Sequence, residues 1–173
     1  MTNGTPLLGK FRGVVVENVD PNMIGRIKVM VPAVSGLSLS NWAMPCFPVA
    51  GMQTGVFSVP IIGSGVWVEF EQGDADYPIW SGCYWGSAAE QPALVTTVPP
   101  PTPAFALSTP LGNGIVVSDG LGPSGAGGIV LKTAGGAMIV VNDTGITISN
   151  GKGAAITMVG STVDINAGAL TVT

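Results

Sequence analysis

Residues 138–172 read MIVVNDTGITISNGKGAAITMVGSTVDINAGALTV. Triplets with apolar residues at both outer positions recur in this stretch, and glycine, asparagine, serine or aspartate separates them. The triplets span residues 139–141, 146–148, 156–158, 163–165 and 170–172, with earlier ones at 115–117 and 129–131. This pattern predicts a series of short β-strands, each with one apolar face and one face of threonine, aspartate or valine.

These strands are too short to fold as one isolated chain. They bury too little apolar surface to offset their ordering entropy, and they leave open edges. Phe105 is the only aromatic residue after residue 90, so large side chains are not available to thicken a core. We therefore expect several copies to wind together around a shared axis. Three chains in a triangular prism satisfy this geometry, although the pattern alone does not distinguish three copies from two or four.

We assign the packing between copies to the outer positions of the last five triplets. They are Ile139, Val141, Ile146, Ile148, Ile156, Met158, Val163, Ile165, Leu170 and Val172. The two outer positions of a strand share one face and the middle position takes the other. The sequence leaves open which of these faces is turned toward the axis.

The preceding half of the chain has a different composition, with every aromatic residue except Phe105. Large aromatic residues fill the core of a globular domain. Alternation over residues 26–31 and 66–71 predicts strands with these inward-facing residues: Ile27, Val29, Val31, Val66, Val68 and Phe70. Four or five strands with evenly spaced turns in about 80 residues predict a small closed barrel.

A proline-rich segment separates the two halves. Residues 87–110 include Pro99, Pro100 and Pro101, a composition that favours a stiff, extended connector. We therefore expect four parts in the chain: an N-terminal arm at 1–8, a barrel at 9–86, a linker at 87–110 and a trimeric needle at 111–173.

Two motifs in the first half resemble those of a known family. They are G-x-V-x-x-x-x-D-P-x-x-x-G-R-x-K-V from Gly13 to Val29 and P-x-x-G-x-x-V-x-V-x-F-E-x-G-D from Pro60 to Asp74. The runs GKFRGVVVENVDPNMIGRIKVMVPAV, NWAMP and GVFSVPIIGSGVWVEFEQGDADYPIWSGCYWG carry the resemblance almost continuously over residues 9–86. They resemble the OB-fold domain of contractile-tail spike proteins, namely the VgrG proteins of type VI secretion and the phage baseplate assembly protein V family.

This resemblance implies an all-β fold, with an N-terminal OB-fold barrel followed by a C-terminal three-chain intertwined β-helix or β-prism needle. It implies a homotrimeric central spike that seats on a trimeric baseplate hub protein and pierces the target envelope when the sheath contracts. A PAAR-type tip protein would bind the blunt end, at Leu170, Thr171, Val172 and Thr173. The hub domains and the lysozyme-like insertion of larger relatives are not expected here.

Composition excludes several other classes of function. The chain has no histidine, which removes histidine-based catalysis, most zinc and iron sites, and the iron-binding tip of some phage relatives. Six basic residues and a net charge of −4 do not make a nucleic-acid surface. Residues 120–125 match G-x-G-x-x-G, but no helix is expected after them. We expect no catalytic residue, metal or cofactor, and buried free thiols at Cys46 and Cys83.

No signal peptide is visible at the N-terminus. We expect synthesis in a bacterial cytoplasm, incorporation into a phage virion baseplate or a contractile injection particle, and transient contact with a target membrane. The alternative is an OB-fold carbohydrate-binding module with a trimeric fibrous tail. Binding to a glycan array would favour that alternative, whereas capture of hub and tip proteins would favour the spike.

Overall fold

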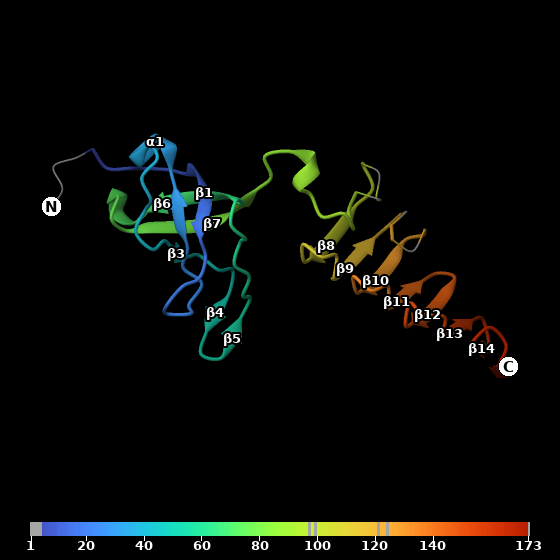
Figure 1. The fold of residues 1–173 in the computed structure, drawn as a ribbon. Coiled ribbons are helices and arrows are strands. Elements are labelled where there is room, and N and C mark those ends of the chain that lie inside the picture. Colours follow the sequence, from blue (N-terminus) through green and yellow to red (C-terminus); the bar gives the residue numbers. More distant parts are fainter. Residues whose placement is uncertain (1–4, 97, 99, 121, 124, 173) are drawn as a thin grey trace. The chain divides into compact units, whose positions relative to one another are not determined.

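The computed structural model describes residues 5–96, 98, 100–120, 122–123 and 125–172. The chain divides into two compact units, Met1–Ala88 and Ala89–Thr173. In Figure 1 the first unit runs from blue to green and the second from green to red. Strands dominate both units, which confirms the predicted all-β fold class with an N-terminal OB-like barrel.

The first unit is a small barrel whose sheet closes on itself. Its strand order is β2-β1-β6-β7-β3, and β3 pairs in parallel with β7 while the other neighbours are antiparallel. Backbone pairs Ile27–Ala43 and Met30–Leu39 join the segment leading into β3 back to β2. The elements are β1 (Phe11–Glu17), β2 (Lys28–Met30), α1 (Pro32–Ser35), β3 (Met44–Pro45), β4 (Ala50–Gly51), β5 (Thr54–Gly55), β6 (Gly65–Phe70), η1 (Glu71–Gly73) and β7 (Pro78–Tyr84).

The barrel core follows the predicted alternation. All the expected inward-facing residues are buried: Ile27, Val29, Val31, Val66, Val68 and Phe70. Val15 of β1 and Trp80 of β7 complete the same cluster. The arm expected at residues 1–8 is attached at its described end, because Leu7 packs against this core and its N–H donates to the Gly73 carbonyl at 3.0 Å.

The second unit is one long antiparallel sheet. In the described part of this unit, its eight strands lie side by side in chain order, from β8 to β15. The elements are η2 (Ala88–Glu90), which begins at the last residue of the first unit, β8 (Ala104–Ser108), β9 (Gly114–Ser118), β10 (Gly128–Lys132), β11 (Met138–Asn142), β12 (Gly145–Ser149), β13 (Ala155–Val159), β14 (Thr162–Ile165) and β15 (Leu170–Val172). Each strand pairs with its neighbour in the chain, so no connection has to pass over another strand.

The segment expected as a linker differs from that expectation in two ways. Residues 104–108 form strand β8, which pairs with β9 in the sheet. Upstream, turns bring Leu94 onto the sheet, where it is buried beside Val116 and Val130. Apolar residues interrupt the prolines here, and burying them against the sheet is more favourable than leaving them in an extended connector. The four-part division of the chain otherwise stays a prediction.

Candidate assembly surfaces

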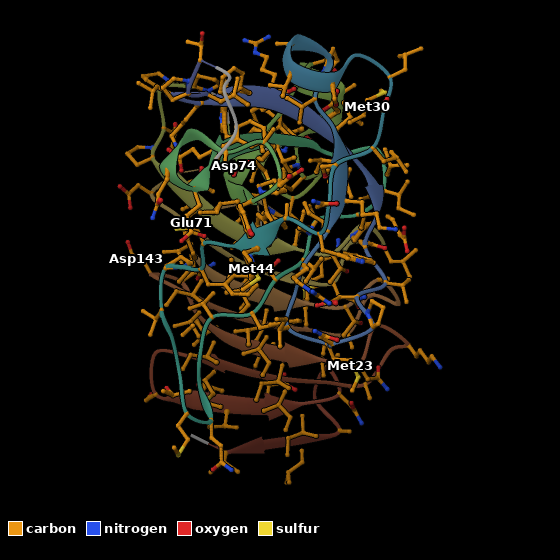
Figure 2. All side chains as sticks on the ribbon, turned by 90° about the vertical axis from the view of Figure 1, so that its left-hand side faces the viewer. Met23, Met30, Met44, Glu71, Asp74 and Asp143 are labelled. Carbon is orange, nitrogen blue, oxygen red and sulfur yellow. The ribbon has the colours of Figure 1, made fainter. Side chains whose placement is uncertain are left out.

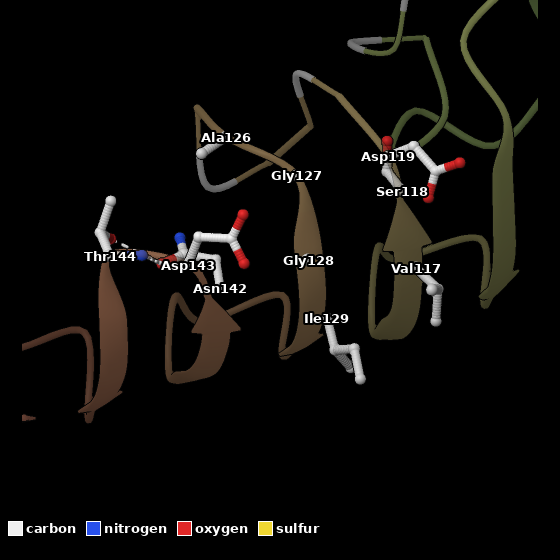
Figure 3. Close-up of a pocket in the computed structure, with 10 residues that line it drawn as sticks. All are labelled: Val117, Ser118, Asp119, Ala126, Gly127, Gly128, Ile129, Asn142, Asp143 and Thr144. Atoms are coloured by element: carbon white, nitrogen blue, oxygen red, sulfur yellow. Dashed lines mark hydrogen bonds between the residues drawn. The ribbon is translucent and has the colours of Figure 1, made fainter.

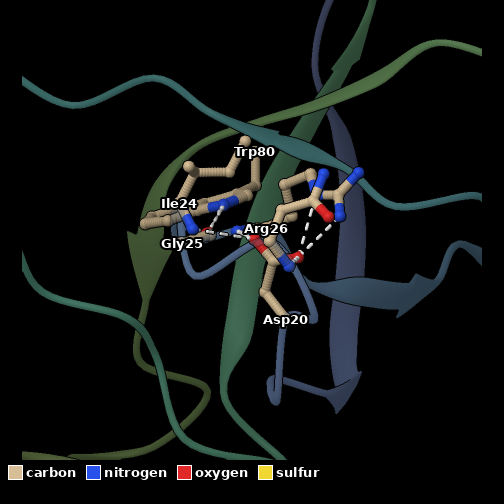
Figure 4. Close-up of polar contacts among 6 residues, drawn as sticks. Asp20, Ile24, Gly25, Arg26 and Trp80 are labelled. Atoms are coloured by element: carbon tan, nitrogen blue, oxygen red, sulfur yellow. Dashed lines mark hydrogen bonds and ion pairs between the residues drawn. The ribbon is translucent and has the colours of Figure 1, made fainter.

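The loop between β1 and β2 is built around one carboxylate. Asp20 accepts hydrogen bonds from the backbone N–H groups of Asn22, Ile24 and Arg26, at 3.0 to 3.2 Å. The Arg26 guanidinium adds two more, through Nε at 3.0 Å and Nη2 at 2.7 Å, as Figure 4 shows. The Arg26 guanidinium and these backbone donors hold the pKa of the Asp20 carboxyl well below its usual range. The side chain of Asp20 is only 3% exposed, which leaves it no room to act on a ligand.

Gly25 completes this loop for steric reasons. Its φ is +84°, and a Cβ there would lie 2.9 Å from the Phe47 ring and 3.3 Å from Phe57. The indole N–H of Trp80 donates to the Gly25 carbonyl at 3.1 Å (Figure 4). The Asp-Pro-x-x-x-Gly-Arg motif therefore serves the local structure of the barrel. It holds the β1–β2 loop beside Phe47 and Phe57, which lie before β4 and after β5.

The β1–β2 loop and the region of the β4–β5 hairpin expose apolar side chains. Met23 extends from the β1–β2 loop into solvent (Figure 2), and Met52 lies at the tip of the β4–β5 hairpin. The exposed apolar residues are Val19 at 77% and Met23 at 85% in the β1–β2 loop, Met52 at 95% in the hairpin, and Phe57 at 68% and Ile62 at 61% in the connection from β5 to β6. A concentration of exposed apolar residues on loops of a folded domain is typical of a protein interaction surface.

The predicted packing residues all lie on one face of the second sheet. Ile139 is directly opposite Ile148, which is directly opposite Ile156, and the same in-register pairing continues to the last strand. Residues directly opposite each other on neighbouring strands point to the same face. We call this surface the apolar face. It comprises Phe105, Leu107, Ile115, Val117, Ile129, Leu131, Ile139, Val141, Ile146, Ile148, Ile156, Met158, Val163, Ile165, Leu170 and Val172.

The apolar face is uncovered in the single chain. Its aliphatic residues from Ile115 to Ile148 are each 37 to 42% exposed, and Phe105 and Leu107 are more exposed still. The four residues on β13 and β14 are half-buried, whereas Leu170 and Val172 are exposed at 55% and 57%.

The middle positions form the opposite face, and the chain itself covers part of it. Val116, Val130 and Val140 are 1%, 3% and 8% exposed, and they form a cluster with Leu94. Farther along, this face carries the paired residues Thr147 and Thr157. Because its apolar part already has a cover, the outer positions are the face that remains available to another copy.

Sequence reasoning missed the first strand of this face. Phe105 and Leu107 pair with Val117 and Ile115, so they belong to the same apolar face as the predicted residues. The signal was present, because residues 105–107 have the same apolar–x–apolar pattern as the later triplets. The surrounding prolines concealed it.

The residues predicted to contact a tip protein lie at the C-terminal edge of the sheet. Leu170 and Val172 belong to β15, which pairs with β14 through Ile165 and Val163. In the described residues β15 is the last strand of the sheet, so its other edge has no strand beside it. Thr173 and the side chain of Thr171 lie outside the described residues.

No cluster of three or more His, Cys, Asp or Glu residues that could hold a metal ion occurs among the described residues. A hollow of about 380 Å³ lies at one side of the second sheet and is lined in part by Asp119, Asp143 and Thr144 (Figure 3).

The prediction of buried thiols was wrong, because Cys46 and Cys83 are both exposed. Cys46 directly follows β3 and Cys83 lies near the end of β7, and a small apolar residue on the barrel surface needs no cover.

In the described residues, no helix is long and apolar enough to cross a membrane.

Comparison with curated proteins gave no match. Two family descriptions do match the chain, one in each unit. Residues 11–85 match the type VI secretion system/phage-baseplate injector OB domain. Residues 104–171 match the phage baseplate V C-terminal trimerisation domain. The chain therefore carries, in this order, a domain similar to the injector OB domain and a domain similar to the baseplate V trimerisation domain, as expected of a phage or type VI secretion baseplate spike protein.

Proposed function

We propose that the chain is the homotrimeric central spike of a contractile phage tail or of a related injection particle. Three copies pack their apolar faces around one axis and form a needle from residues 111–173, which strand β8 extends. The uncovered apolar face on all eight described strands of a matched trimerisation domain is the observation that supports this proposal most strongly. Burial of that face in the trimer would supply the hydrophobic stabilisation that the single sheet lacks.

The proposed action is mechanical. Sheath contraction drives the tube forward, and the spike at its front concentrates the force on a narrow tip that breaches the target envelope. In-register apolar contacts along every strand would make the needle stiff, because close-packed interiors resist compression. Both matched families are structural domains of baseplates, which supports a role without catalysis.

We place the hub contact on the exposed apolar loops of the barrel, around Met23 and Met52. Gly25 of the β1–β2 loop lies beside Phe47, in the segment that leads into the β4–β5 hairpin, so these two parts of the barrel are neighbours. The opposite end of the chain, from Leu170 to Thr173, would carry a PAAR-type tip protein. The exposed Leu170 and Val172 and the unpaired edge of β15 support this assignment.

The mass of the purified full-length protein in solution tests the proposal. Light scattering should give a mass about three times that of the 17.4 kDa chain, and the same species should persist in SDS without boiling. A monomer whose residues 111–173 are cleaved rapidly by protease would contradict the needle.

Capture experiments separate the spike from a carbohydrate-binding fibre. Immobilised protein should retain hub and tip proteins from a lysate of the particle's host, and it should show no selective binding on a glycan array. Replacing Met23 and Met52 by Asp should release the hub protein and leave the trimer mass unchanged. Selective glycan binding without hub capture would reverse the assignment.

A further inference from the structure

Four of the six charged residues of the second unit lie at the two borders of its sheet. Successive turns fall on alternate borders, because the strands are antiparallel and follow chain order. We call the border with the turns after β9, β11 and β13 the first border, and the other the second border. Asp119 and Asp143 lie on the first border, and Lys132 and Lys152 lie on the second.

These four side chains have no ion-pair partner within the described part of the chain. The ion pairs found there are Lys10–Glu69, Arg26–Asp20 and Lys28–Glu17, all in the barrel. Asp119, Asp143 and Lys152 are exposed, and Lys132 is half-buried. The remaining charged residue of the sheet, Asp164, differs from them, because its carboxylate accepts a hydrogen bond from the Gly168 N–H at 2.7 Å.

The charges of the two borders are offset from each other by one strand, in the same direction for both pairs. Asp119 follows β9 and Asp143 lies in the turn between β11 and β12. Lys132 ends β10 and Lys152 lies in the turn between β12 and β13. Each lysine is therefore one strand farther along the sheet than one aspartate, a step of about 5 Å. A lysine side chain is long enough to span that step.

The charged groups also avoid the apolar face. Lys132 lies on the same face of the sheet as Val130, and Leu131 lies on the other face. The amine of Lys132 is therefore kept away from the apolar contacts. Figure 3 shows the carboxylates of Asp119 and Asp143 at the first border. The side chains of Val117 and Ile129 point away from these carboxylates. The hollow of about 380 Å³ between these turns leaves space for a side chain from outside.

A ring of identical chains has only one way to join such borders. Rotation about the ring axis places the first border of each copy against the second border of the next, so like borders never meet. We propose that Lys132 and Lys152 of one copy pair with Asp119 and Asp143 of the neighbouring copy at each corner of the trimer. This inference rests on the proposed trimer and adds to it a device that selects neighbour and register.

The device matters because the apolar face repeats on every strand. Staggered copies would still bury apolar residues, so hydrophobic packing distinguishes poorly between an in-register ring and an open, staggered polymer. Surface ion pairs are individually weak. Their arrangement disfavours wrong pairings through like charges, and that is how interface charges give specificity.

Charge reversal on one border tests this proposal in the full-length protein. Asp119→Lys combined with Asp143→Lys makes both borders basic. Subunit exchange between differently labelled trimers should then accelerate about tenfold or more at low salt. High salt should reduce the difference, because it screens exposed charges. Adding Lys132→Asp and Lys152→Asp exchanges the borders completely, and this quadruple variant should return to the wild-type exchange rate.

A matched control adds the same charge elsewhere. Glu71→Lys with Asp76→Lys changes two exposed acids of the barrel and should leave the exchange rate unchanged. Equal exchange rates in the reversed and wild-type proteins would overturn the border pairing while the trimer stands, as would a quadruple variant that fails to recover. A wild-type protein that is not a trimer would overturn the proposed function itself, and the border pairing with it.

Discussion

The carboxylate of Asp20 receives five hydrogen bonds, three from backbone N–H groups and two from the Arg26 guanidinium. The sequence motif places an acid, a glycine and an arginine close together, but it does not reveal why. In the structure the acid organises the loop, the arginine compensates its charge and the glycine admits the Phe47 ring. A pattern that carries a family resemblance here reports on folding and not on a ligand.

Asp20 gives the barrel a defined response to acid. Its lowered pKa means that its stabilising contribution is complete above the unfolded-state pKa of about 4 and declines as the pH falls from there toward the folded-state pKa. Asp20→Asn should therefore destabilise the barrel at neutral pH, and the difference from wild type should shrink below about pH 4. Guanidinium unfolding followed by tryptophan fluorescence measures the free energy of unfolding of the variant and the wild type at each pH. Asp76→Asn, at an exposed position, should show no such trend, and a pH-independent effect of Asp20→Asn would contradict the mechanism.

Gly25 and Gly63 separate backbone strain from steric contact. Both have positive φ, +84° and +90°, but only at Gly25 would a Cβ meet other atoms, those of Phe47 and Phe57. Gly63→Ala should cost about 1 kcal/mol from its left-handed conformation alone. Gly25→Ala should cost about 1 to 3 kcal/mol more, because the two rings must move. Equal losses of unfolding free energy in denaturant titrations would show that the loop accommodates the methyl group.

Strands were predictable from the sequence where their alternation is undisturbed. The triplets from residue 115 onward all form strands, because a period of two places both outer residues on one face whatever the neighbours are. The strand at Phe105 and Leu107 was hidden by flanking prolines, since composition reports a segment's average and pairing depends on individual positions. The turns that bury Leu94 depend on contacts distant in the sequence, and no local pattern encodes them.

Neighbouring strands β12 and β13 offer a matched test of the apolar face. Ile148 pairs with Ile156 on that face, and Thr147 pairs with Thr157 on the other. Ile148→Asp with Ile156→Asp should abolish the trimer, because burying unpaired carboxylates costs on the order of several kcal/mol per chain. Thr147→Asp with Thr157→Asp also places two carboxylates opposite each other and should keep the trimer. Light scattering reads out both, and a trimeric Ile148/Ile156 variant would show that another surface joins the copies.

The whole chain combines two units with different requirements for stability. The barrel encloses its own core, whereas the second sheet leaves one face uncovered. A fragment of residues 1–88 should therefore fold as a monomer with a cooperative unfolding transition, and a fragment of residues 89–173 should form trimers. Circular dichroism and light scattering on the two fragments check this. A trimeric barrel fragment, or a monomeric folded sheet fragment, would relocate the assembly surface.

Association of several copies was predictable from the sequence, and the number three was not. An apolar face calls for a partner, but any closed arrangement that buries it satisfies the alternation. The trimerisation family supplies the number, and the charges at Lys132, Lys152, Asp119 and Asp143 could not be interpreted before the sheet order placed them on opposite borders.

The chain-order pairing of β8 to β15 also makes the length of this domain easy to change in evolution. Duplication or loss of one hairpin adds or removes two strands, about 10 Å, and returns the following residues to the same face and border. Duplication of a single strand would reverse the direction of everything after it. Such a domain can change its length in even steps, with the rest of the protein unaltered.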